Sequence, residues 1–187
     1  AAAALSRILA RVSADSPKLA EPRTVDADSA EPELAPIGGR YRVQGVLGTG
    51  GMACVYRATD TATGRELAVK RLTLQRSEKG FAEAAALFER EFHTLVALSH
   101  PSIVAVYDYG VDALGPFYTM ELLDGGDLKE KSPCDWRVAC GLISEVCSAL
   151  ALVHSRRLTH GDVSPRNVRC TRDGRAKLID FGALMPM

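Results

Sequence analysis

The stretch that most constrains this chain is residues 160–182, which reads HGDVSPRNVRCTRDGRAKLIDFG. Pro165 stands between Asp162 and Asn167, and proline disfavours helix at the residue before it, so these residues are predicted to lie in a loop. Downstream, the segments NVRC and AKLID flank the turn TRDGR, a pattern typical of a short β-hairpin. The hairpin is expected to return Asp180 to the loop. The carboxylate and amide oxygens then converge, and such a set suits a hard cation such as Mg²⁺ and the phosphates it carries.

The same stretch resembles two motifs of the protein kinases. HGDVSPRN is similar to the catalytic loop H-R-D-x-x-x-x-N, and DFG matches the metal-binding motif. DFG alone is a weak signal because it is short, whereas the two motifs joined by a strand, a turn and a strand are specific. The resemblance implies that Asp162 accepts the proton of the attacking hydroxyl and that Asn167 and Asp180 hold Mg²⁺. An ordinary polar hairpin is the alternative interpretation.

The composition places few limits on function. The chain has 187 residues, of which 47% are apolar, and this is enough for one core or two small lobes. Its 23 basic and 23 acidic side chains cancel, so the charge does not indicate a nucleic acid or an anionic membrane as a partner. We see no apolar run of the length that spans a bilayer, and we expect no membrane segment.

The cysteines indicate a reducing compartment. Their number is odd, and they show neither a CxxC pair nor the ligand spacing of a zinc site. Free thiols are therefore expected, and we place the chain in the cytoplasm. The cysteines are Cys54, Cys134, Cys140, Cys147 and Cys170.

Residues 1–37 are predicted to be a flexible linker. Residues 1–12 have the composition of a short helix, and the remainder is rich in Ala, Pro, Asp and Glu with few aromatic side chains. A docking or phosphorylation segment is the alternative. The chain begins AAAALSRILARV without Met, and a fragment boundary explains this more simply than a targeting helix does.

Residues 41–72 alternate in the manner of three β-strands, YRVQGVLG, MACVYRATD and RELAVKRL, with TATG as a turn. Glycines in the first link let backbone N–H groups approach phosphate oxygens. A dinucleotide-binding fold also accepts Ala53 at the third motif position, but its turn must open a helix, whereas CVYRAT is β-branched and aromatic. A mobile hairpin without a ligand is a further interpretation. The segment resembles the glycine-rich loop of bacterial Ser/Thr kinases, which implies ATP contacts from Gly48, Thr49, Gly50, Gly51, Met52, Ala53 and Val55.

The third of these strands carries a lysine in an informative setting. Strand alternation puts Ala68 and Lys70 on one face and Val69 on the other. A small apolar residue beside a lysine suits an adenine nucleotide, with the alanine against the base and the lysine at the phosphates. A single lysine on a strand is usually only solvated, so a role in phosphate binding depends on which side chains contact it. LAVK resembles V-A-I-K of the third kinase strand, which implies the phosphate-binding role for Lys70.

Residues 78–98 are predicted to form a long helix, because apolar side chains recur at intervals of three and four. Glu91 precedes Leu95 by four residues and shares its face, which places a carboxylate beside the packed stripe. A solvated glutamate is the alternative, and the kinase resemblance instead implies an ion pair between Glu91 and Lys70. The predicted stripe is Phe81, Ala84, Ala85, Phe88, Phe92, Leu95 and Val96.

Two more strands are predicted, one in residues 103–109 and one in GPFYTMELLDGGDL, which continues as the link between two lobes. The resemblance implies that Met120 is the gatekeeper residue of the ATP site and that the backbones of Glu121 and Leu123 form hydrogen bonds with adenine. Asp127 is placed for the ribose hydroxyls, although an aspartate after Gly-Gly is equally typical of a helix N-cap.

Residues 135–155 form the second predicted helix. Its cysteines fall among the apolar positions and are expected to be small core residues. The predicted stripe is Val138, Leu142, Ile143, Val146, Leu150 and Val153.

Three residues depart from the kinase pattern. Gly161 stands where the family usually has an arginine, which in many kinases pairs with a phosphorylated loop. Ser164 stands where a lysine that contacts the γ-phosphate is common, so a reduced turnover is expected. Arg169 stands where the family has an apolar residue beneath adenine, and we expect its methylene stem to fill this place while its head reaches water.

The resemblance covers residues 41–182 and implies an α+β, bilobal, protein-kinase-like fold. Residues 38–121 are expected to form an N-terminal lobe with an antiparallel five-stranded sheet and one long helix. Residues 122–187 are expected to form an incomplete, mostly helical C-terminal lobe that stops before the activation segment. The implied function is ATP- and Mg²⁺-dependent phosphoryl transfer to Ser or Thr of a protein substrate, with the fragment itself inactive. The alternatives are a small-molecule kinase of the aminoglycoside or choline type, whose loop often reads HGD, and a nucleotide-binding pseudokinase scaffold, which Gly161 and Ser164 favour.

Overall fold

The computed structural model describes residues 35–74 and 78–187. The helix predicted in residues 1–12 and most of the predicted linker lie outside the described residues. The end of that linker is a correction: Ile37 is buried, pairs with Tyr41 in an isolated bridge, and belongs to the same apolar cluster as Phe117. Its large aliphatic side chain gains by covering one face of the sheet, so the N-terminal lobe includes Ile37, one residue before the expected boundary.

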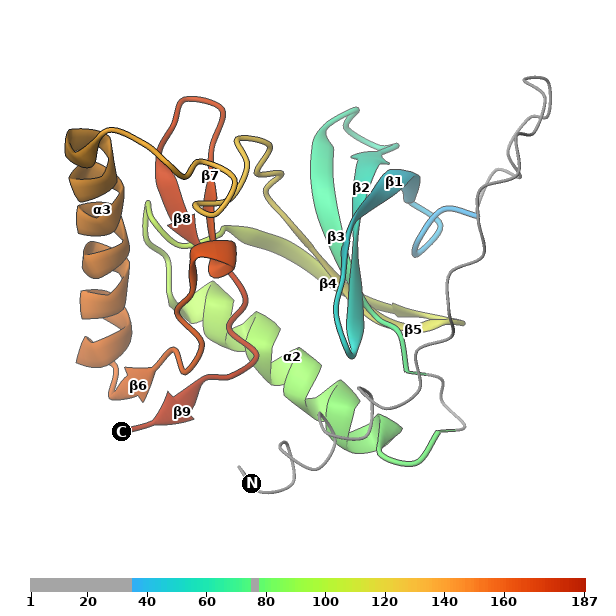
Figure 1. Ribbon diagram of the computed structural model, residues 1–187. Coiled ribbons are helices and arrows are strands. Elements are labelled where there is room, and N and C mark those ends of the chain that lie inside the picture. The colour runs from blue at the N-terminus through green and yellow to red at the C-terminus, as the bar shows by residue number, and fades with distance from the viewer. Residues whose placement is uncertain (1–34, 75–77) are drawn as a thin grey trace, which may run out of the picture.

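The N-terminal lobe is the predicted five-stranded antiparallel sheet, with strand order β1-β2-β3-β5-β4 (Figure 1). On the sheet face that points away from the long helix of this lobe, a cluster of buried side chains includes Ala58, Leu67 and Val69. The strands are β1 (Tyr41–Thr49), β2 (Ala53–Asp60), β3 (Glu66–Leu72), β4 (Val106–Asp112) and β5 (Gly115–Met120).

The fourth strand begins later than the sequence predicts. Ile103 does not join the N-terminal sheet, because it forms a parallel bridge with Leu178 in the other lobe and is buried there. The N–H of Val104 donates to the Leu178 carbonyl at 3.1 Å, and the N–H of Leu178 donates to the Ser102 carbonyl at 2.9 Å. Tertiary pairing therefore uses the backbone that a strand over residues 103–105 would have needed.

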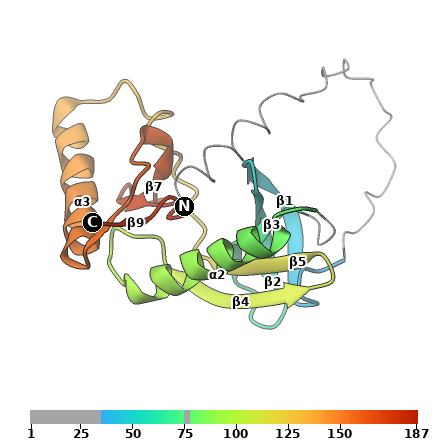
Figure 2. The same cartoon turned by 90° about the horizontal axis from the view of Figure 1, so that it is seen from below.

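Helix α2 (Phe81–Ala97) packs along β4 and β5, as Figure 2 shows from below. It begins after Gly80, whose φ of 94° ends the preceding turn in a left-handed conformation. Ala84, Phe88 and Leu95 are buried as predicted, together with Phe92. Val96 is 54% exposed, contrary to the prediction, because one residue beyond Leu95 the helix has turned by about 100° away from the sheet.

Helix α3 (Trp136–Ser155) begins at Asp135, whose side chain accepts a hydrogen bond of 2.8 Å from the N–H of Arg137. One of its faces packs against β8 through Leu142, Val146, Ala149 and Val153. Its other face is exposed, and there the sequence prediction was wrong: an apolar repeat shows that a side chain belongs to a stripe, but not how wide the covered part of the helix is. The predicted core residues found exposed are Val138, Cys140, Ile143 and Cys147.

The same helix bears on the expectation that the chain has no membrane segment. Among the described residues, Trp136–Ser155 is the one helix long and apolar enough to cross a bilayer by length and composition. The core helix of a soluble protein can have the same length and composition, so this property does not assign α3 to a membrane.

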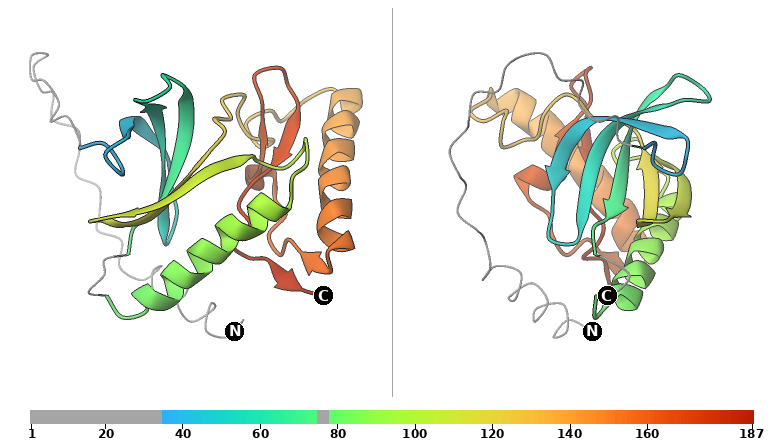
Figure 3. Two further views of the ribbon diagram at one scale, coloured as in Figure 1. Left: turned by 180° about the vertical axis from the view of Figure 1, so that it is seen from behind. Right: turned by 90° about the vertical axis from the view of Figure 1, so that its right-hand side faces the viewer.

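The rest of the C-terminal lobe consists of short strands around residues 160–167, which we call the catalytic-type loop. The predicted hairpin is present and lies between α3 and the N-terminal sheet (Figure 3). α3 is the one long helix in the described part of this lobe, which is less helical than expected. The largest buried cluster includes Tyr118 and Phe88 of the first lobe and Leu178 and Phe181 of the second, so both lobes share it. The remaining elements are β6 (Leu158–Thr159), the 3₁₀ turn η1 (Pro165–Asn167), β7 (Val168–Cys170), β8 (Ala176–Leu178) and β9 (Met185–Pro186).

Candidate active site between the lobes

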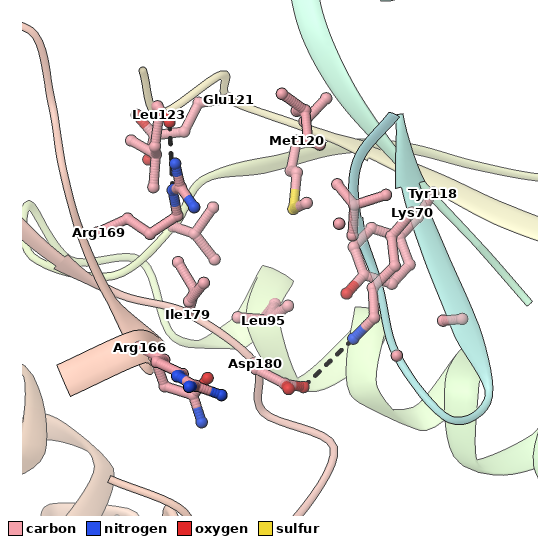
Figure 4. Close-up of a pocket in the computed structure, with 18 of the residues that line it drawn as sticks. Lys70, Leu95, Tyr118, Met120, Glu121, Leu123, Arg166, Arg169, Ile179 and Asp180 are labelled. Atoms are coloured by element: carbon pink, nitrogen blue, oxygen red, sulfur yellow. Dashed lines mark hydrogen bonds and ion pairs between the residues drawn. The ribbon is translucent and has the colours of Figure 1, made fainter. Parts of the chain in front are cut away.

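A cavity of about 390 Å³ lies between the two lobes, and most of the predicted site residues line it. Strands β1, β2 and β3 form one wall, the segment after β5 forms the back, and the hairpin β7–β8 with η1 forms the other wall (Figure 4). Its lining is mostly apolar. Lys70 and Asp180 lie at one end, and Glu121 and Arg169 lie at the other (Figure 4). An apolar cavity with a few polar groups is the usual make-up of a small-molecule site.

The predicted ion pair is present at the end where Lys70 lies. Lys70 Nζ lies 2.8 Å from Glu91 Oε1 and 3.0 Å from Oε2. The same ammonium group lies 3.3 Å from Asp180 Oδ1, a contact that joins the two lobes (Figure 4). The Tyr118 hydroxyl donates to Glu91 Oε1 at 3.0 Å and is fully buried. Tyr118 escaped the sequence analysis, because nothing in residues 115–120 signals that this tyrosine orients a glutamate of a distant helix.

Electrostatics keep the lysine charged. Burial lowers the pKa of Lys70, but the carboxylates of Glu91 and Asp180 raise it, and the pKa of Lys70 lies above the ordinary value for lysine. Burial also raises the pKa of Tyr118, which keeps its hydroxyl protonated as a hydrogen-bond donor. The site therefore presents a fixed cation beside Ala68 on β3, as strand alternation predicted.

The catalytic-type loop is held by its own hydrogen bonds. Asn167 Nδ2 donates to the backbone oxygen of Asp162 at 2.9 Å and to its Oδ2 at 2.8 Å. His160 is buried: its Nε2 lies 3.1 Å from the Ile179 carbonyl, and its Nδ1 lies 3.3 Å from the N–H of Asp162. These partners define a neutral ring with the proton on Nε2, since Nδ1 must accept. Burial lowers the pKa of His160, which favours the same neutral form.

Asn167 and Asp180 are placed as the sequence predicts, next to each other on the cavity wall. The N–H of Ile179 donates to the Asn167 carbonyl at 2.9 Å, which holds the DFG segment against the loop. Because Asn167 Nδ2 faces Asp162, its amide oxygen remains for a ligand, and the Asp180 side chain is 51% exposed. This pair of oxygen donors fits a divalent cation. Within the part of the chain that the structure describes, no group of three His, Cys, Asp or Glu side chains forms a metal site.

The glycine-rich loop meets the cavity with most of its predicted residues. Gly48, Thr49 and Gly50 line it, followed by Ala53 and Val55 on β2. The N–H of Gly50 donates to the Ala53 carbonyl at 2.8 Å, which closes the tight turn.

Gly51 and Met52 are not part of the cavity wall, unlike the prediction. The backbone carbonyl of Met52 accepts from the N–H of Thr73 at 2.8 Å, and its side chain packs against the main core cluster. Leu47 lines the cavity instead and was missed, because it reads as an ordinary strand residue.

The segment after β5 presents its backbone to the cavity. Met120, Glu121 and Leu123 line it, as predicted. Among the backbone hydrogen bonds of residues 35–74 and 78–187, none uses the carbonyl of Glu121 or the N–H of Leu123. An acceptor and a donor therefore stand free two residues apart, which matches the donor–acceptor edge of an adenine ring.

Asp127 lies away from the cavity wall. Its Oδ1 accepts from the N–H of Glu130 at 2.8 Å, and Glu130 Oε2 accepts from the N–H of Asp127 at 3.2 Å. This reciprocal pair resembles a helix cap, but residues 128–130 form a turn and not a helix. The ribose role of Asp127 remains a prediction.

The catalytic-type loop departs from the family pattern at Gly161 and Ser164, and the structure explains the first departure. Gly161 has a φ of 81°, and a Cβ there would clash with the Ala183 carbonyl, so this backbone favours glycine. Ser164 does not line the cavity, whereas Arg166 does and has no ion-pair partner among the described residues. Arg166 was missed as a site residue, although its place beside Asn167 in the loop motif was a usable signal.

Arg169 corrects a further expectation. It lines the cavity, but its head does not simply reach water: Nε donates to the Leu123 carbonyl at 3.3 Å (Figure 4). Arg169 on β7 thus bonds a carbonyl of the segment that links the lobes, residues 121–127, which we call the interlobe segment.

The comparisons with known proteins agree with this geometry. A family model described as the protein kinase domain matches residues 41–185. A probable serine/threonine-protein kinase of Streptomyces coelicolor is 39% identical over 159 residues, which cover 81% of this chain and 23% of that protein. Serine/threonine-protein kinase PknL of Mycobacterium tuberculosis is 34% identical over 163 residues, which cover 84% of this chain and 40% of the relative. Serine/threonine-protein kinase PrkC of Bacillus subtilis is 35% identical over 150 residues, or 78% of this chain and 23% of the relative.

This chain spans less than half the length of each of these relatives. Even so, the family model matches well over half of the chain, and it does so over both lobes and the cavity between them. The chain therefore belongs to the protein kinase domain family.

Proposed function

We propose that the protein containing this chain transfers the γ-phosphoryl group of ATP to Ser or Thr of a protein substrate, with Mg²⁺ as the metal ion. The family implies ATP and a divalent metal. One observation carries the proposal: the ammonium group of Lys70 bonds both Glu91 and Asp180 at one end of a cavity whose other end offers a free donor and acceptor. That arrangement suits a ligand with phosphates at one end and a base at the other.

The roles follow from chemistry at named atoms. Asp162 would accept the proton of the attacking hydroxyl, while Asn167 holds its carboxylate in place at 2.8 Å. Lys70 would neutralise charge on the phosphates, and Arg166, a cation without a partner among the described residues, would meet anionic oxygen on the same side. Asn167 and Asp180 are the residues that would hold Mg²⁺, which would supply charge neutralisation at the phosphates when bound.

Protein substrates are favoured over small molecules by the relatives, whose names describe serine/threonine-protein kinases. The pseudokinase alternative is disfavoured by the retained set of Lys70, Glu91, Asp162, Asn167 and Asp180, which a scaffold would not need. ATP is a cytoplasmic phosphoryl donor, and the five free cysteines suit a reducing compartment, so we propose that this domain works in the cytoplasm.

The test separates metal binding from proton transfer in the full-length protein. Thermal unfolding is measured with ATP plus Mg²⁺ and with ATP plus EDTA, since a ligand of the folded state raises the melting temperature. We expect a larger shift with Mg²⁺ in the wild type and equal shifts in Asp180→Asn. Asp162→Asn should keep the Mg²⁺-dependent shift and lose most transfer to a Ser/Thr protein substrate.

Asp173→Asn is the matched control, because Asp173 lies in the exposed hairpin turn away from the cavity. It should leave both readouts unchanged. Wild-type protein that binds Mg²⁺-ATP but phosphorylates only a small molecule, or nothing, would contradict the proposed activity.

A further inference from the structure

Arg169 has a position in the cavity that the proposed activity does not use. It lies in the middle of β7, is half-buried, and lines the cavity. Figure 4 shows its side chain running along the wall of the C-terminal lobe to Leu123, with Ile179 nearby, while Lys70 and Asp180 lie at the other end of the opening. Its charge is therefore at the end of the cavity where the free backbone donor and acceptor lie.

The fold holds this side chain in place from two directions. The interlobe segment runs directly against β7, because the N–H of Gly125 donates to the Cys170 carbonyl at 3.0 Å and the N–H of Cys170 donates to the Gly126 carbonyl at 2.8 Å. A Cβ at Gly125 would lie 2.7 Å from the Cys170 carbonyl oxygen and closer still to that of Thr171. Only glycine allows so close an approach. The approach brings the Leu123 carbonyl within 3.3 Å of Arg169 Nε.

The place of a flat ring in the cavity follows from its walls. The free carbonyl of Glu121 and the free N–H of Leu123 define the edge that a base would bond. Val55 and Ala68 form the apolar wall on the sheet side. A ring between that wall and the C-terminal lobe has Ile179 and Arg169 beneath it.

We propose that Arg169 is a base-recognition residue, whose guanidinium group stacks beneath the nucleotide ring while its Nε remains bonded to the Leu123 carbonyl. A guanidinium group is planar and weakly hydrated, and it stacks on aromatic faces in a way that an ammonium group does not. Its attraction to a ring face strengthens where water is excluded, as in a half-buried wall. The inference rests on the proposed nucleotide binding and adds the side chain that stacks on the base.

The experiment compares ligands that differ only in whether they carry the ring. Dissociation constants of the full-length protein are measured by calorimetry for adenosine, for ATP with Mg²⁺, and for tripolyphosphate with Mg²⁺. Arg169→Met keeps the methylene stem and removes the guanidinium head. We expect it to weaken adenosine and ATP by the same factor, about three- to tenfold, and to leave tripolyphosphate unchanged.

Arg172→Met is the matched control. Arg172 sits on the same hairpin and forms an ion pair with Asp124 of the interlobe segment, but it does not line the cavity. Its loss removes one positive charge beside the same segment without changing the cavity wall, so adenosine should bind as it does to the wild type. Thermal unfolding of each ligand-free variant checks that the fold is retained.

Each other outcome overturns the inference. Equal adenosine affinity in wild type and Arg169→Met would mean that only the stem matters. A loss that appears with tripolyphosphate as well would mean that the charge acts on phosphates, and an equal loss in Arg172→Met would mean that any cation beside the segment suffices. Wild-type protein that binds neither adenosine nor ATP would overturn the proposed function itself, and this inference with it.

Discussion

Two buried lysine–glutamate pairs in this molecule have the same chemistry and different surroundings. Lys70 on β3 lies 2.8 Å from Glu91, and Lys177 on β8 lies 2.6 Å from Glu121. The side-chain exposures are 14% and 5% in the first pair and 11% and 19% in the second. Burial and distance therefore do not distinguish the two pairs.

Their third contacts do. Lys70 also reaches Asp180, whose side chain is half exposed at the cavity. Lys177 instead reaches the carbonyl of Ile103 at 3.5 Å, while Glu121 accepts from the N–H of Ala105 at 2.7 Å. The first pair faces the cavity, where a ligand can bind, whereas the second pair bonds backbone groups and so positions the interlobe segment. What a buried ion pair does thus depends on where its remaining hydrogen-bonding capacity points.

The largest effect should come from Lys70→Met. Because the ammonium group faces the phosphates, we expect phosphoryl transfer by the full-length protein to fall by at least about 100-fold, or roughly 3 kcal/mol of barrier. Initial rates with a Ser/Thr protein substrate measure it. Lys129→Met, which changes an exposed turn residue, is the control and should transfer at the wild-type rate.

Lys177→Met should act on stability instead. Removing the lysine leaves Glu121 as a poorly exposed carboxylate without its cation, so the free energy of unfolding should fall by about 1–3 kcal/mol in urea titrations. Lys177→Arg keeps a cation and should lose less. If Lys177→Met slowed transfer as much as Lys70→Met does, the distinction between the two pairs would be wrong.

Double variants sharpen the comparison further. Lys177→Met combined with Glu121→Met should be more stable than Lys177→Met alone, by about 1 kcal/mol, since no unpaired charge remains. Lys70→Met combined with Glu91→Met should recover no transfer, because the phosphate-binding cation is still missing. Urea titrations and initial rates are compared across the two cycles; recovered transfer in the second cycle would show that Lys70 has only a structural role.

The smallest effect is a pH dependence of the first pair. The pKa of Lys70 is raised above its ordinary 10.5, so its contribution to stability is complete below about pH 10.5 and is lost as the pH rises through the higher folded-state value. The difference in melting temperature between wild type and Lys70→Met should therefore stay constant from pH 7 to 10 and shrink above pH 10.5. A difference that shrinks already between pH 7 and 9 would contradict the raised pKa.

Local patterns in the sequence were sufficient for the elements and for the core of the site. Pro165 and the turn TRDGR predict the loop and the hairpin that carry Asp162, Asn167 and Asp180, because both signals depend on backbone preferences within a few residues. The helix that carries Glu91 was equally visible, since its apolar period is local. The activity of each residue stays a prediction until the variants are measured.

Coverage of a helix face was not predictable in the same way. Val138 and Ile143 of α3 were expected in the core and are exposed, whereas Ala149 of the same helix is fully buried. Val96 of α2 was also expected in the core and is exposed. An apolar repeat gives the direction of a stripe, but its covered width depends on which elements pack there. Ile103 illustrates the same point for a strand, since its partner is Leu178, far along the chain.

The sequence by itself determined the family resemblance, the five-stranded sheet with its helix, and the set of charged residues between the lobes, because motif spacing and hydrophobic period are properties of neighbouring residues. Only the tertiary structure decided which side chains complete that set. Tyr118 reaches Glu91 across 27 positions, and Arg169 reaches Leu123 across 46. Contacts between residues so far apart arise when the sheet, the interlobe segment and the hairpin pack together, and no local pattern records them.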